Sequence, residues 1–296
     1  MPKLSVLIAT YNRAPHLIRT LESLLEQDLN SELWQIIIVD NNSSDSTKSS
    51  CEEFIASHRE FDIKYFFERE QGLSYARNCG MANCQGDYIV FVDDDEIFSK
   101  DFLSAYYKLF ESEPTALVAG GRVEAQYDFK TPSWLMRFSE RPIAGTVNFS
   151  PQTKYFPSTR YPTGGNMAFR ASVFATYGNF NTALGRKGSS LMGGEEKDLF
   201  ERINAKIYYV YDALIFHIIP ESRVSVEYVY KVASMVGVSE RLRTKERGIY
   251  GRRLILEGVK WAGALVFALG YVCVGRFSAA RVLLGMRWRT SKGLIK

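Results

Sequence analysis

Cysteine and histidine are both scarce in this chain, with four cysteines and three histidines among 296 residues. No two cysteines form a CxxC pair, and none has a cluster of histidines beside it. The sequence therefore lacks the cysteine framework of small secreted domains. We interpret the cysteines as free, mostly buried thiols of a protein in a reducing compartment. They are Cys51, Cys79, Cys84 and Cys273.

The chain also lacks an uninterrupted apolar run of the roughly 20 residues that a helix needs to cross a bilayer. Its first apolar run, residues 4–9, is short, and polar residues follow at once, which argues against a secretory signal peptide. Residues 261–275 form a stretch of 15 residues without a charge, bounded by Lys260 and Arg276. These absences predict a cytoplasmic protein.

Neither apolar nor charged residues are rare: they make up 46% and 24% of the chain, as in a globular protein with a substantial core. The charge is unevenly distributed, however. Residues 221–296 hold 15 basic and 5 acidic side chains, a net charge of +10, whereas residues 1–220 hold 22 and 28, a net charge of −6. A basic C-terminal region predicts an anionic partner, either a membrane or nucleic acid.

Short β-prone runs alternate with helical patterns along the first 220 residues. This alternation predicts an α/β fold with a mostly parallel sheet and helices on both faces. Residues 127–162 contain five prolines and many aromatic residues, which predicts a long loop region. The expected strands cover residues 4–9, 34–39, 63–67, 88–92, 116–123 and 207–217, and the expected helices cover residues 15–27, 72–83 and 102–110.

After Pro220 the pattern becomes helical, over residues 224–238 and from residue 254 onward. We therefore predict a domain of residues 1–220 and a separate helical region of residues 221–296. Lysine and arginine alternate with apolar side chains near the C-terminus, which is typical of a segment that lies on anionic lipid. The alternative is a buried helical part of the same domain.

The segment of residues 88–95 carries the clearest chemical signal, because five β-prone residues run directly into Asp93, Asp94 and Asp95. Three like charges buried together need a cation. Carboxylate oxygens suit Mg²⁺ or Mn²⁺, and open α/β sheets bind ligands at the carboxyl ends of their strands. The segment predicts a metal site, with a solvated acidic turn as the alternative.

Several segments taken in order resemble the family 2 glycosyltransferases, whose catalytic domain has the Rossmann-like GT-A fold. The resemblance covers roughly residues 3–220. Each motif is weak alone, whereas the ordered set is specific. The motifs are the strand and loop at 5–13, the strand and turn at 36–45, the helix at 72–80 with Ala76-Arg77-Asn78, the DxD motif Asp93-Asp94-Asp95, Gly164-Gly165-Asn166 and Gly194-Glu195-Glu196.

The resemblance implies a divalent metal, Mn²⁺ or Mg²⁺, held by Asp93 and Asp95. His217 matches a histidine that completes the metal site in some GT-A enzymes, although a packed, hydrogen-bonded role is the alternative. Simpler interpretations also exist for Tyr11 in loop packing, Asp40 as a helix cap and Arg77 in a surface ion pair. The resemblance implies the following residues for the nucleotide-sugar donor: Ala9, Thr10, Tyr11, Arg13, Asp40, Arg77, Asp93 and Asp94.

An inverting transferase also needs a general base for the acceptor hydroxyl. The family places this acid second in a Glu-Asp pair, which implies Glu196 here, with glutamate replacing the usual aspartate. Asp198 is the rival, and its simpler role is an acidic residue in the first turn of a helix. Gly165, Asn166 and Glu195 are expected to orient the acceptor or its loop.

These features predict an inverting, metal-dependent glycosyltransferase that transfers one sugar, with UDP as the favoured nucleotide, to a hydroxyl of a glycan or lipid-linked saccharide in bacterial polysaccharide biosynthesis. The Gln-x-x-Arg-Trp motif of processive relatives is absent, because Leu284 precedes Arg287-Trp288 where glutamine is required. We expect the protein to be peripheral on the inner face of the cell membrane.

Three other functions remain open. A catalytically silent nucleotide-sugar-binding or scaffold subunit is one, supported only by the glutamate at position 196. A sugar-nucleotide pyrophosphorylase would need a glycine-rich loop after the first strand, and residues 10–13 contain no glycine. Nucleic-acid binding by the basic region fits the apolar residues 261–275 less well than lipid does.

Overall fold

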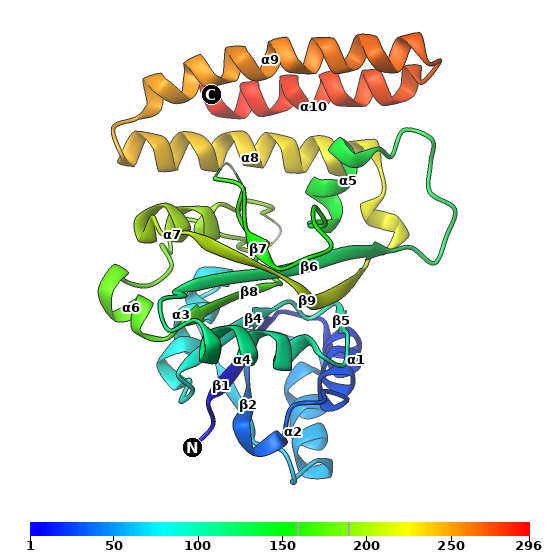
Figure 1. The fold of residues 1–296 in the computed structure, drawn as a ribbon. Helices are drawn as coiled ribbons and strands as arrows, with labels where there is room; N and C mark the ends of the chain where they lie inside the picture. The colour runs from blue at the N-terminus through cyan, green and yellow to red at the C-terminus, as the bar shows by residue number, and fades with distance from the viewer. Residues whose placement is uncertain (159, 189) are drawn as a thin grey trace. The chain divides into compact units, whose positions relative to one another are not determined.

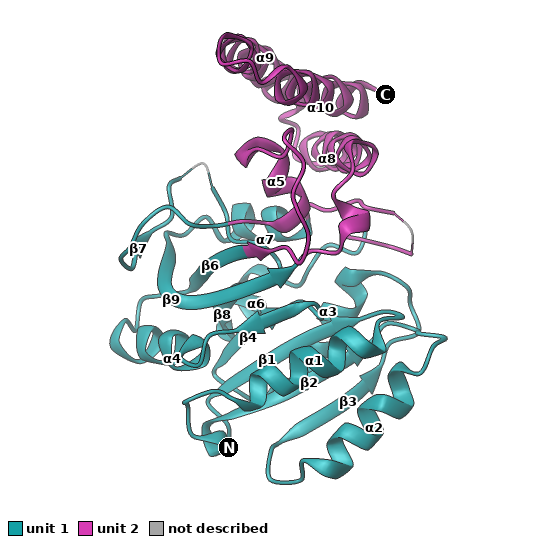
Figure 2. Ribbon diagram, turned by 90° about the vertical axis from the view of Figure 1, so that its right-hand side faces the viewer, with its two compact units in different colours: residues 1–124, 147–183, 195–218 teal, residues 125–146, 184–194, 219–296 magenta. Residues whose placement is uncertain are grey.

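The computed structural model describes residues 1–158, 160–188 and 190–296. Contacts divide the chain into two compact units that interleave along the sequence. Unit 1 comprises residues 1–124, 147–183 and 195–218, and unit 2 comprises residues 125–146, 184–194 and 219–296 (Figure 2, teal and magenta). The change of unit at residues 218 and 219 lies next to the boundary predicted at 220. Residues 125–146 and 184–194 join the C-terminal region, which the sequence did not indicate.

Unit 1 is built on a mixed sheet with the strand order β3-β2-β1-β4-β8-β6-β9-β5, and β7 pairs with β9 (Figure 1). The four neighbouring strands β3, β2, β1 and β4 run parallel to one another, whereas β8 is antiparallel to both β4 and β6. β9 is antiparallel to β5 and β7. The strands are β1 (Leu4–Thr10), β2 (Trp34–Asp40), β3 (Ile63–Phe67), β4 (Tyr88–Val92), β5 (Glu96–Phe98), β6 (Val118–Gln126), β7 (Lys154–Tyr155), β8 (Met167–Arg170) and β9 (Ile207–Ile218).

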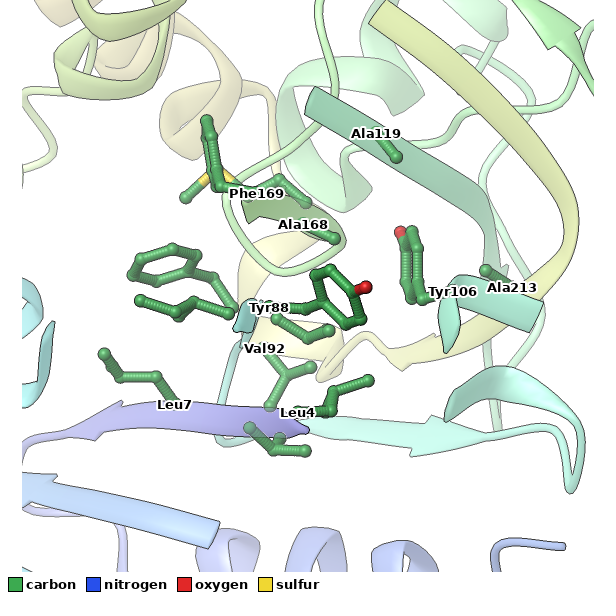
Figure 3. Close-up of a cluster of buried hydrophobic side chains, with 14 of the residues drawn as sticks. Leu4, Leu7, Tyr88, Val92, Tyr106, Ala119, Ala168, Phe169 and Ala213 are labelled. Atoms are coloured by element: carbon green, nitrogen blue, oxygen red, sulfur yellow. The ribbon is translucent and has the colours of Figure 1, made fainter. Parts of the chain in front are cut away.

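Helices cover both faces of the parallel strands, which confirms the predicted layers and explains why these strands are mostly apolar. Ile36 and Ile38 of β2 belong to the main core, whereas Ile37 and Val39 pack with Ala76 of α3 on the opposite face. Figure 3 shows part of the main core. The helices of unit 1 are α1 (Ala14–Leu25), α2 (Thr47–Ser57), α3 (Leu73–Asn83), α4 (Phe102–Ser112), α6 (Ser172–Tyr177) and α7 (Glu195–Ile203), with a 3₁₀ turn at Ser31–Leu33.

The parallel register brings the carboxyl ends of β1, β2 and β4 to one edge of the sheet. Thr10 lies opposite Asp40, and Ile8 lies opposite Val92. The acidic residues that follow Val92 therefore emerge beside the loop after Thr10. This edge is where an open α/β sheet binds its ligands.

Unit 2 is helical, and two of its helices approach closely at glycines. A Cβ added at Gly237 or at Gly293 would collide with a backbone carbonyl oxygen, that of Thr290 or of Ser234 respectively. The glycines therefore let the backbones of α8 and α10 pack against each other. The helices are α5 (Arg137–Ala144), α8 (Val226–Glu246), α9 (Tyr250–Cys273) and α10 (Phe277–Ile295), and a 3₁₀ turn covers Glu221–Arg223.

The helix α5 lies in the stretch predicted to be a long loop, so that prediction was wrong for residues 137–144. The helix contains Pro142, which obscured its pattern, and it ends at Gly145 in the left-handed conformation. Ile143 and Ala144 bury themselves in the apolar cluster of unit 2. Tertiary packing thus stabilises a helix that local sequence disfavours.

A buried ion network joins α8, α9 and α10. The guanidinium of Arg253 lies 2.7 Å from Glu240 and 2.8 Å from Glu257. Glu257 also lies 2.8 Å from Arg287, and Arg243 lies 2.9 Å from Glu240. Each of these contacts joins opposite charges, so the network holds the three helices in register.

Candidate active site

Four consecutive acidic residues follow β4, one more than the sequence motif contains. Asp94, Asp95 and Glu96 are buried, whereas 39% of the Asp93 side chain is exposed. The backbone N–H of Asp93 donates to the carboxylate of Glu96 at 3.0 Å. Burial and the neighbouring aspartate charges raise the pKa of Glu96 well above its usual value. Glu96 could not be predicted from the sequence motif, because its position depends on the pairing of β5 with β9.

Arg13 brings a positive charge to this acidic cluster. Its two terminal nitrogens lie 2.8 Å from Asp94 Oδ1 and 2.8 Å from Asp95 Oδ2. The hydroxyl of Thr10 donates to the other oxygen of Asp94 at 2.7 Å. Burial is the main reason that the pKa of Asp94 rises to about 7, against the opposing charge of Arg13. Asp94 is thus held by protein groups on both oxygens.

The residues predicted to hold a metal lie together at this edge. His217 Nε2 lies 3.4 Å from Asp95 Oδ2, because the β5–β9 pairing sets His217 opposite Glu96. Carboxylate oxygens and an imidazole nitrogen are a suitable donor set for Mn²⁺ or Mg²⁺. Within the part of the chain that the structure describes, no three such side chains already converge as a metal site. The donor chemistry fits a divalent ion, and Arg13 holds the same Asp95 oxygen in this arrangement.

Arg77 of α3 links this cluster to the first turn of α7. Its guanidinium lies 3.0 Å from Glu195 and 3.2 Å from Glu196, and a further nitrogen lies 3.8 Å from Asp93. Arg77 is buried, so it does not form the surface ion pair considered as an alternative. It bridges the predicted general base and the predicted metal ligand.

The two glutamates at the start of α7 differ in their acidity. Burial would raise the pKa of Glu196, but the charge of Arg77 and hydrogen bonds to the carboxylate lower it below its usual value. Burial and the adjacent charge of Glu196 raise the pKa of Glu195 to about 8. Glu196 is therefore ionised at neutral pH, as a proton acceptor must be.

The Gly164-Gly165 turn lies directly against the charged side chains of Glu196, Arg77 and Glu96. A Cβ added at Gly164 would collide with Glu196 and with Arg77, and one added at Gly165 would collide with Glu96. A side chain at either position would displace these charged groups, which is a physical reason for the glycine pair. The predicted place of Gly165 beside the site thus agrees with its surroundings.

The predicted nucleotide residues of β1 and β2 lie on the same edge. Asp40 is buried and accepts hydrogen bonds from the Tyr65 hydroxyl at 2.8 Å and from the Ser43 N–H at 2.9 Å. Tyr11 is exposed, in the turn that follows Ala9 and Thr10. Asp40 is therefore oriented by the protein, and Tyr11 presents an open aromatic ring.

Two other predicted residues are occupied within the protein. The buried amide of Asn166 donates to the carbonyls of Arg122 and Ala213 and accepts from the Tyr106 hydroxyl. The side-chain amide of Asn166 is therefore bonded within the protein and does not extend toward a ligand. Asp198, the rival for the general base, is buried in an ion pair with Arg202 at 3.0 Å.

Comparisons with known proteins show what the chain as a whole is similar to. The family model described as glycosyl transferase family 2 matches residues 5–178. The chain is 25% identical over 258 residues to the glucosyl-dolichyl phosphate glucuronosyltransferase of Haloferax volcanii, covering 81% of this chain and 77% of that protein. It is 27% identical over 230 residues to the succinoglycan biosynthesis protein ExoM of Rhizobium meliloti, covering 76% and 69%.

Among solved structures, the fold is similar to that of the mannosyltransferase PcManGT from Pyrobaculum calidifontis in complex with GDP-Man and Mn²⁺. The TM-score is 0.63 at 16% identity, and the match covers 98% of this chain and 87% of that one. At this identity the likeness shows the GT-A type of fold. It extends over the C-terminal helices as well as the sheet.

Proposed function

The chain belongs to glycosyl transferase family 2 and is a glycosyltransferase, and on that premise we propose that it is an inverting, metal-dependent enzyme that transfers a single sugar. The donor is a nucleotide-sugar, with UDP as the nucleotide. The acceptor is a hydroxyl of a lipid-linked saccharide on the inner face of the cell membrane. The product enters glycan biosynthesis.

The observation that carries the proposal is the bridge of Arg77 between Glu196 and Asp93. It joins the acidic edge of the sheet, where a donor diphosphate would lie, to an ionised carboxylate on a separate helix. A direct displacement at a sugar carbon needs its leaving group and its general base on opposite sides of that carbon. The carboxylates of Asp93 and Glu196, which the buried guanidinium of Arg77 links, support a site with this arrangement of base and leaving group.

The side chains take the following parts in the proposed reaction. Glu196 accepts the proton of the acceptor hydroxyl as that oxygen bonds to the anomeric carbon, and the bond from this carbon to the diphosphate breaks. Asp40 accepts a hydrogen bond from the base of the nucleotide, and Tyr11 packs against it. A divalent ion held by Asp95, Asp93 and His217 would supply positive charge for the departing diphosphate.

The acceptor class is supported by the relatives. The Haloferax volcanii protein is named for a dolichyl phosphate-linked substrate, and ExoM is named for succinoglycan biosynthesis. Both names point to assembly of glycans, and the first to a lipid carrier. The solved PcManGT structure contains GDP-Man, so the nucleotide must be tested rather than assumed from the family.

Thermal unfolding with UDP, GDP, CDP and dTDP, each with and without Mn²⁺, tests the donor. A ligand that binds only the folded protein raises the unfolding temperature by mass action. We expect UDP with Mn²⁺ to give the largest rise and Asp95→Asn to abolish it. A larger rise with another nucleotide would replace UDP, and no rise with any of them would contradict a donor site.

The scaffold alternative is tested by donor hydrolysis in the same preparation. An active enzyme hydrolyses its nucleotide-sugar slowly without acceptor, whereas a silent binding subunit shows only the nucleotide-induced rise in unfolding temperature. We expect hydrolysis by the wild type and its loss in Asp95→Asn. A rise in unfolding temperature without hydrolysis or transfer would favour the scaffold function.

A further inference from the structure

A helix on the surface of a protein in water normally buries its apolar side chains and exposes its charged ones. The helix α9 has the reverse pattern. Its inward stripe contains the buried charged residues Arg253 and Glu257 and the small residues Ala264 and Ala268. Its outward side carries large apolar side chains that are at least 65% exposed. Those on α9 and the turn after it are Ile255, Val259, Val266, Leu269 and Val274, and Phe277 follows at the start of α10.

From this reversal we propose that α9 is a membrane-insertion helix. Its apolar side lies among the acyl chains of one leaflet of an anionic bilayer, parallel to the membrane plane and without crossing it. The proposal deepens the membrane location given under Proposed function. The membrane proposal depends on the surface of α9, whereas the proposed function depends on the donor site. An experiment can therefore contradict one of them and leave the other standing.

The exposed apolar area is too large for a surface that faces water only. Side chains of this size each lose about 1.5–3 kcal/mol of burial free energy when they remain in water. Contiguous apolar surfaces on this scale mark binding sites for proteins or lipids. Among the described residues, α9 is also the one helix long and apolar enough, by length and composition, to cross a membrane, and 17% of its apolar window is buried.

Charge identifies lipid as the partner. Residues 247–296 contain ten basic residues and one acidic residue, and the ion network holds the acidic residue, Glu257, together with two of the basic ones, Arg253 and Arg287. Basic side chains at the rim of an apolar surface are attracted by anionic headgroups, at about 1 kcal/mol each near the surface. A second copy of this chain would bring the same positive rim against itself, which opposes self-association through this face.

The contacts of α9 along its length explain why it does not cross the bilayer. Arg253 and Glu257 are held in the ion network with α8 and α10, and the Trp261 indole donates to Ser291 of α10 at 2.9 Å. Figures 1 and 2 both show α9 and α10 side by side. A crossing α9 would carry the exposed Arg281 and Arg289 of α10 into the hydrocarbon, at a cost of about 2.5–3.5 kcal/mol each.

The uncharged length of α9 agrees with this orientation. Fifteen residues separate Lys260 from Arg276. As a helix they would span about 22 Å, less than the hydrocarbon core of about 30 Å. In the membrane plane, in contrast, both flanking side chains can reach the headgroups.

Cys273 provides a natural reporter, because it is exposed at the end of α9. Burial raises the pKa of Cys51 and of Cys84 to about 12 and also raises that of Cys79, which slows their reaction with maleimides. A polarity-sensitive fluorophore on Cys273 should shift to the blue with phosphatidylcholine–phosphatidylglycerol vesicles. Nitroxides near the headgroup of the outer leaflet should quench it, and inner-leaflet nitroxides should not. Cys273→Ser controls for labelling elsewhere.

Vesicle flotation with the double variant Val266→Glu, Leu269→Glu tests the surface itself. We expect binding to fall at least about tenfold, since two charges would enter the leaflet. Leu242→Glu, at an exposed apolar residue of α8, should bind as the wild type does. The nucleotide-induced rise in unfolding temperature should persist in both variants, which shows that they are folded and separates this test from that of the donor site.

Several results would overturn the proposal. They are no vesicle binding by the wild type, equal binding by the double variant, quenching of Cys273 from the inner leaflet only, and a soluble dimer that the double variant abolishes. The last result would assign the surface to a second copy of the chain. Equal binding to vesicles of phosphatidylcholine alone would remove the electrostatic part of the argument.

Discussion

The two units each bury a cluster of charged side chains, and the clusters differ in balance. In the candidate site of unit 1, six carboxyl groups meet two guanidinium groups. In the network of unit 2, two carboxylates meet three guanidinium groups in direct contacts. The first set is Asp93, Asp94, Asp95, Glu96, Glu195 and Glu196 with Arg13 and Arg77, and the second is Glu240 and Glu257 with Arg243, Arg253 and Arg287.

The difference separates a site from a scaffold. Burying an excess of one charge costs free energy, and proteins tolerate this cost where a ligand supplies the opposite charge. The acidic excess of unit 1 is suited to a cation and to chemistry that uses an ionised base. The near-balanced network of unit 2 holds helices together and needs no ligand. Substitution of the proposed base should therefore act on catalysis in the first cluster, whereas substitutions in the second cluster should act on stability alone.

The largest effect is expected for Glu196→Gln. Glutamine keeps the size and the contact with Arg77 but cannot accept the proton, so turnover should fall by about 10²- to 10⁴-fold. Sugar transfer to a lipid-linked acceptor measures this, and the nucleotide-induced rise in unfolding temperature should be unchanged. Glu201→Gln on the same helix is the control. Turnover within a few-fold of the wild type would exclude Glu196 as the base and direct attention to Asp198.

In the second cluster, Arg253→Met should reduce stability and leave donor binding unchanged. The substitution leaves Glu240 and Glu257 buried with less compensation, and breaking buried pairs of this kind costs about 3–5 kcal/mol. Urea titration measures the free energy of unfolding. Arg252→Met, at the exposed neighbouring position, should stay within about 0.5 kcal/mol of the wild type. Equal effects of the two substitutions would show that the network contributes little.

An intermediate effect is expected for Arg13→Gln, which removes the guanidinium between Asp94 and Asp95. The metal-free protein should lose about 1–3 kcal/mol, less than a fully buried pair because a quarter of the Arg13 side chain is exposed. A divalent cation can restore the charge balance. Mn²⁺ should therefore raise the unfolding temperature more in this variant than in the wild type, with Arg19→Gln as the control. Equal rises would indicate that Arg13 and the metal do not share the cluster.

The parallel half of the sheet and its acidic edge were accessible from the sequence. The β1, β2 and β4 strands are long apolar runs, and each ends in polar residues that the parallel register must bring together. Asp93 and Asp95 could be found in this way, whereas Arg77 and His217 were named only through the family resemblance. Glu96 could not be found, because it meets His217 through antiparallel pairing between segments about 120 residues apart.

The C-terminal region shows a different limit of sequence analysis. Its composition predicted helices and lipid contact, but a sequence does not show which side of a helix faces inward. The sequence of α9 contains both a charged and an apolar stripe. The charged stripe is buried because Arg253 forms ion pairs with Glu240 and Glu257. The joining of residues 125–146 to this unit likewise depends on tertiary contacts, such as those of Ile143 in the apolar cluster.

The effect expected of Glu195→Gln depends on pH, and its sign is opposite to that of Arg253→Met. Burial and the charge of Glu196 raise the pKa of Glu195 to about 8 in the folded protein, so the folded state holds a proton that the unfolded state releases above about pH 4.5. The stability of the wild type should therefore fall as the pH rises from about 4.5 to 8. Glutamine removes this loss and can still contact Arg77.

This variant should match the wild type near pH 4 and exceed it by on the order of 4 kcal/mol at pH 8, since each pH unit between the two pKa values changes the difference by about 1.4 kcal/mol. Urea titrations across this range measure the difference, and Glu201→Gln should keep the slope of the wild type. A loss of stability in Glu195→Gln at pH 8 would mean that Glu195 is ionised and required by Arg77. The acidic cluster would then be balanced like the network of unit 2, and the distinction between the two clusters would fail at this residue.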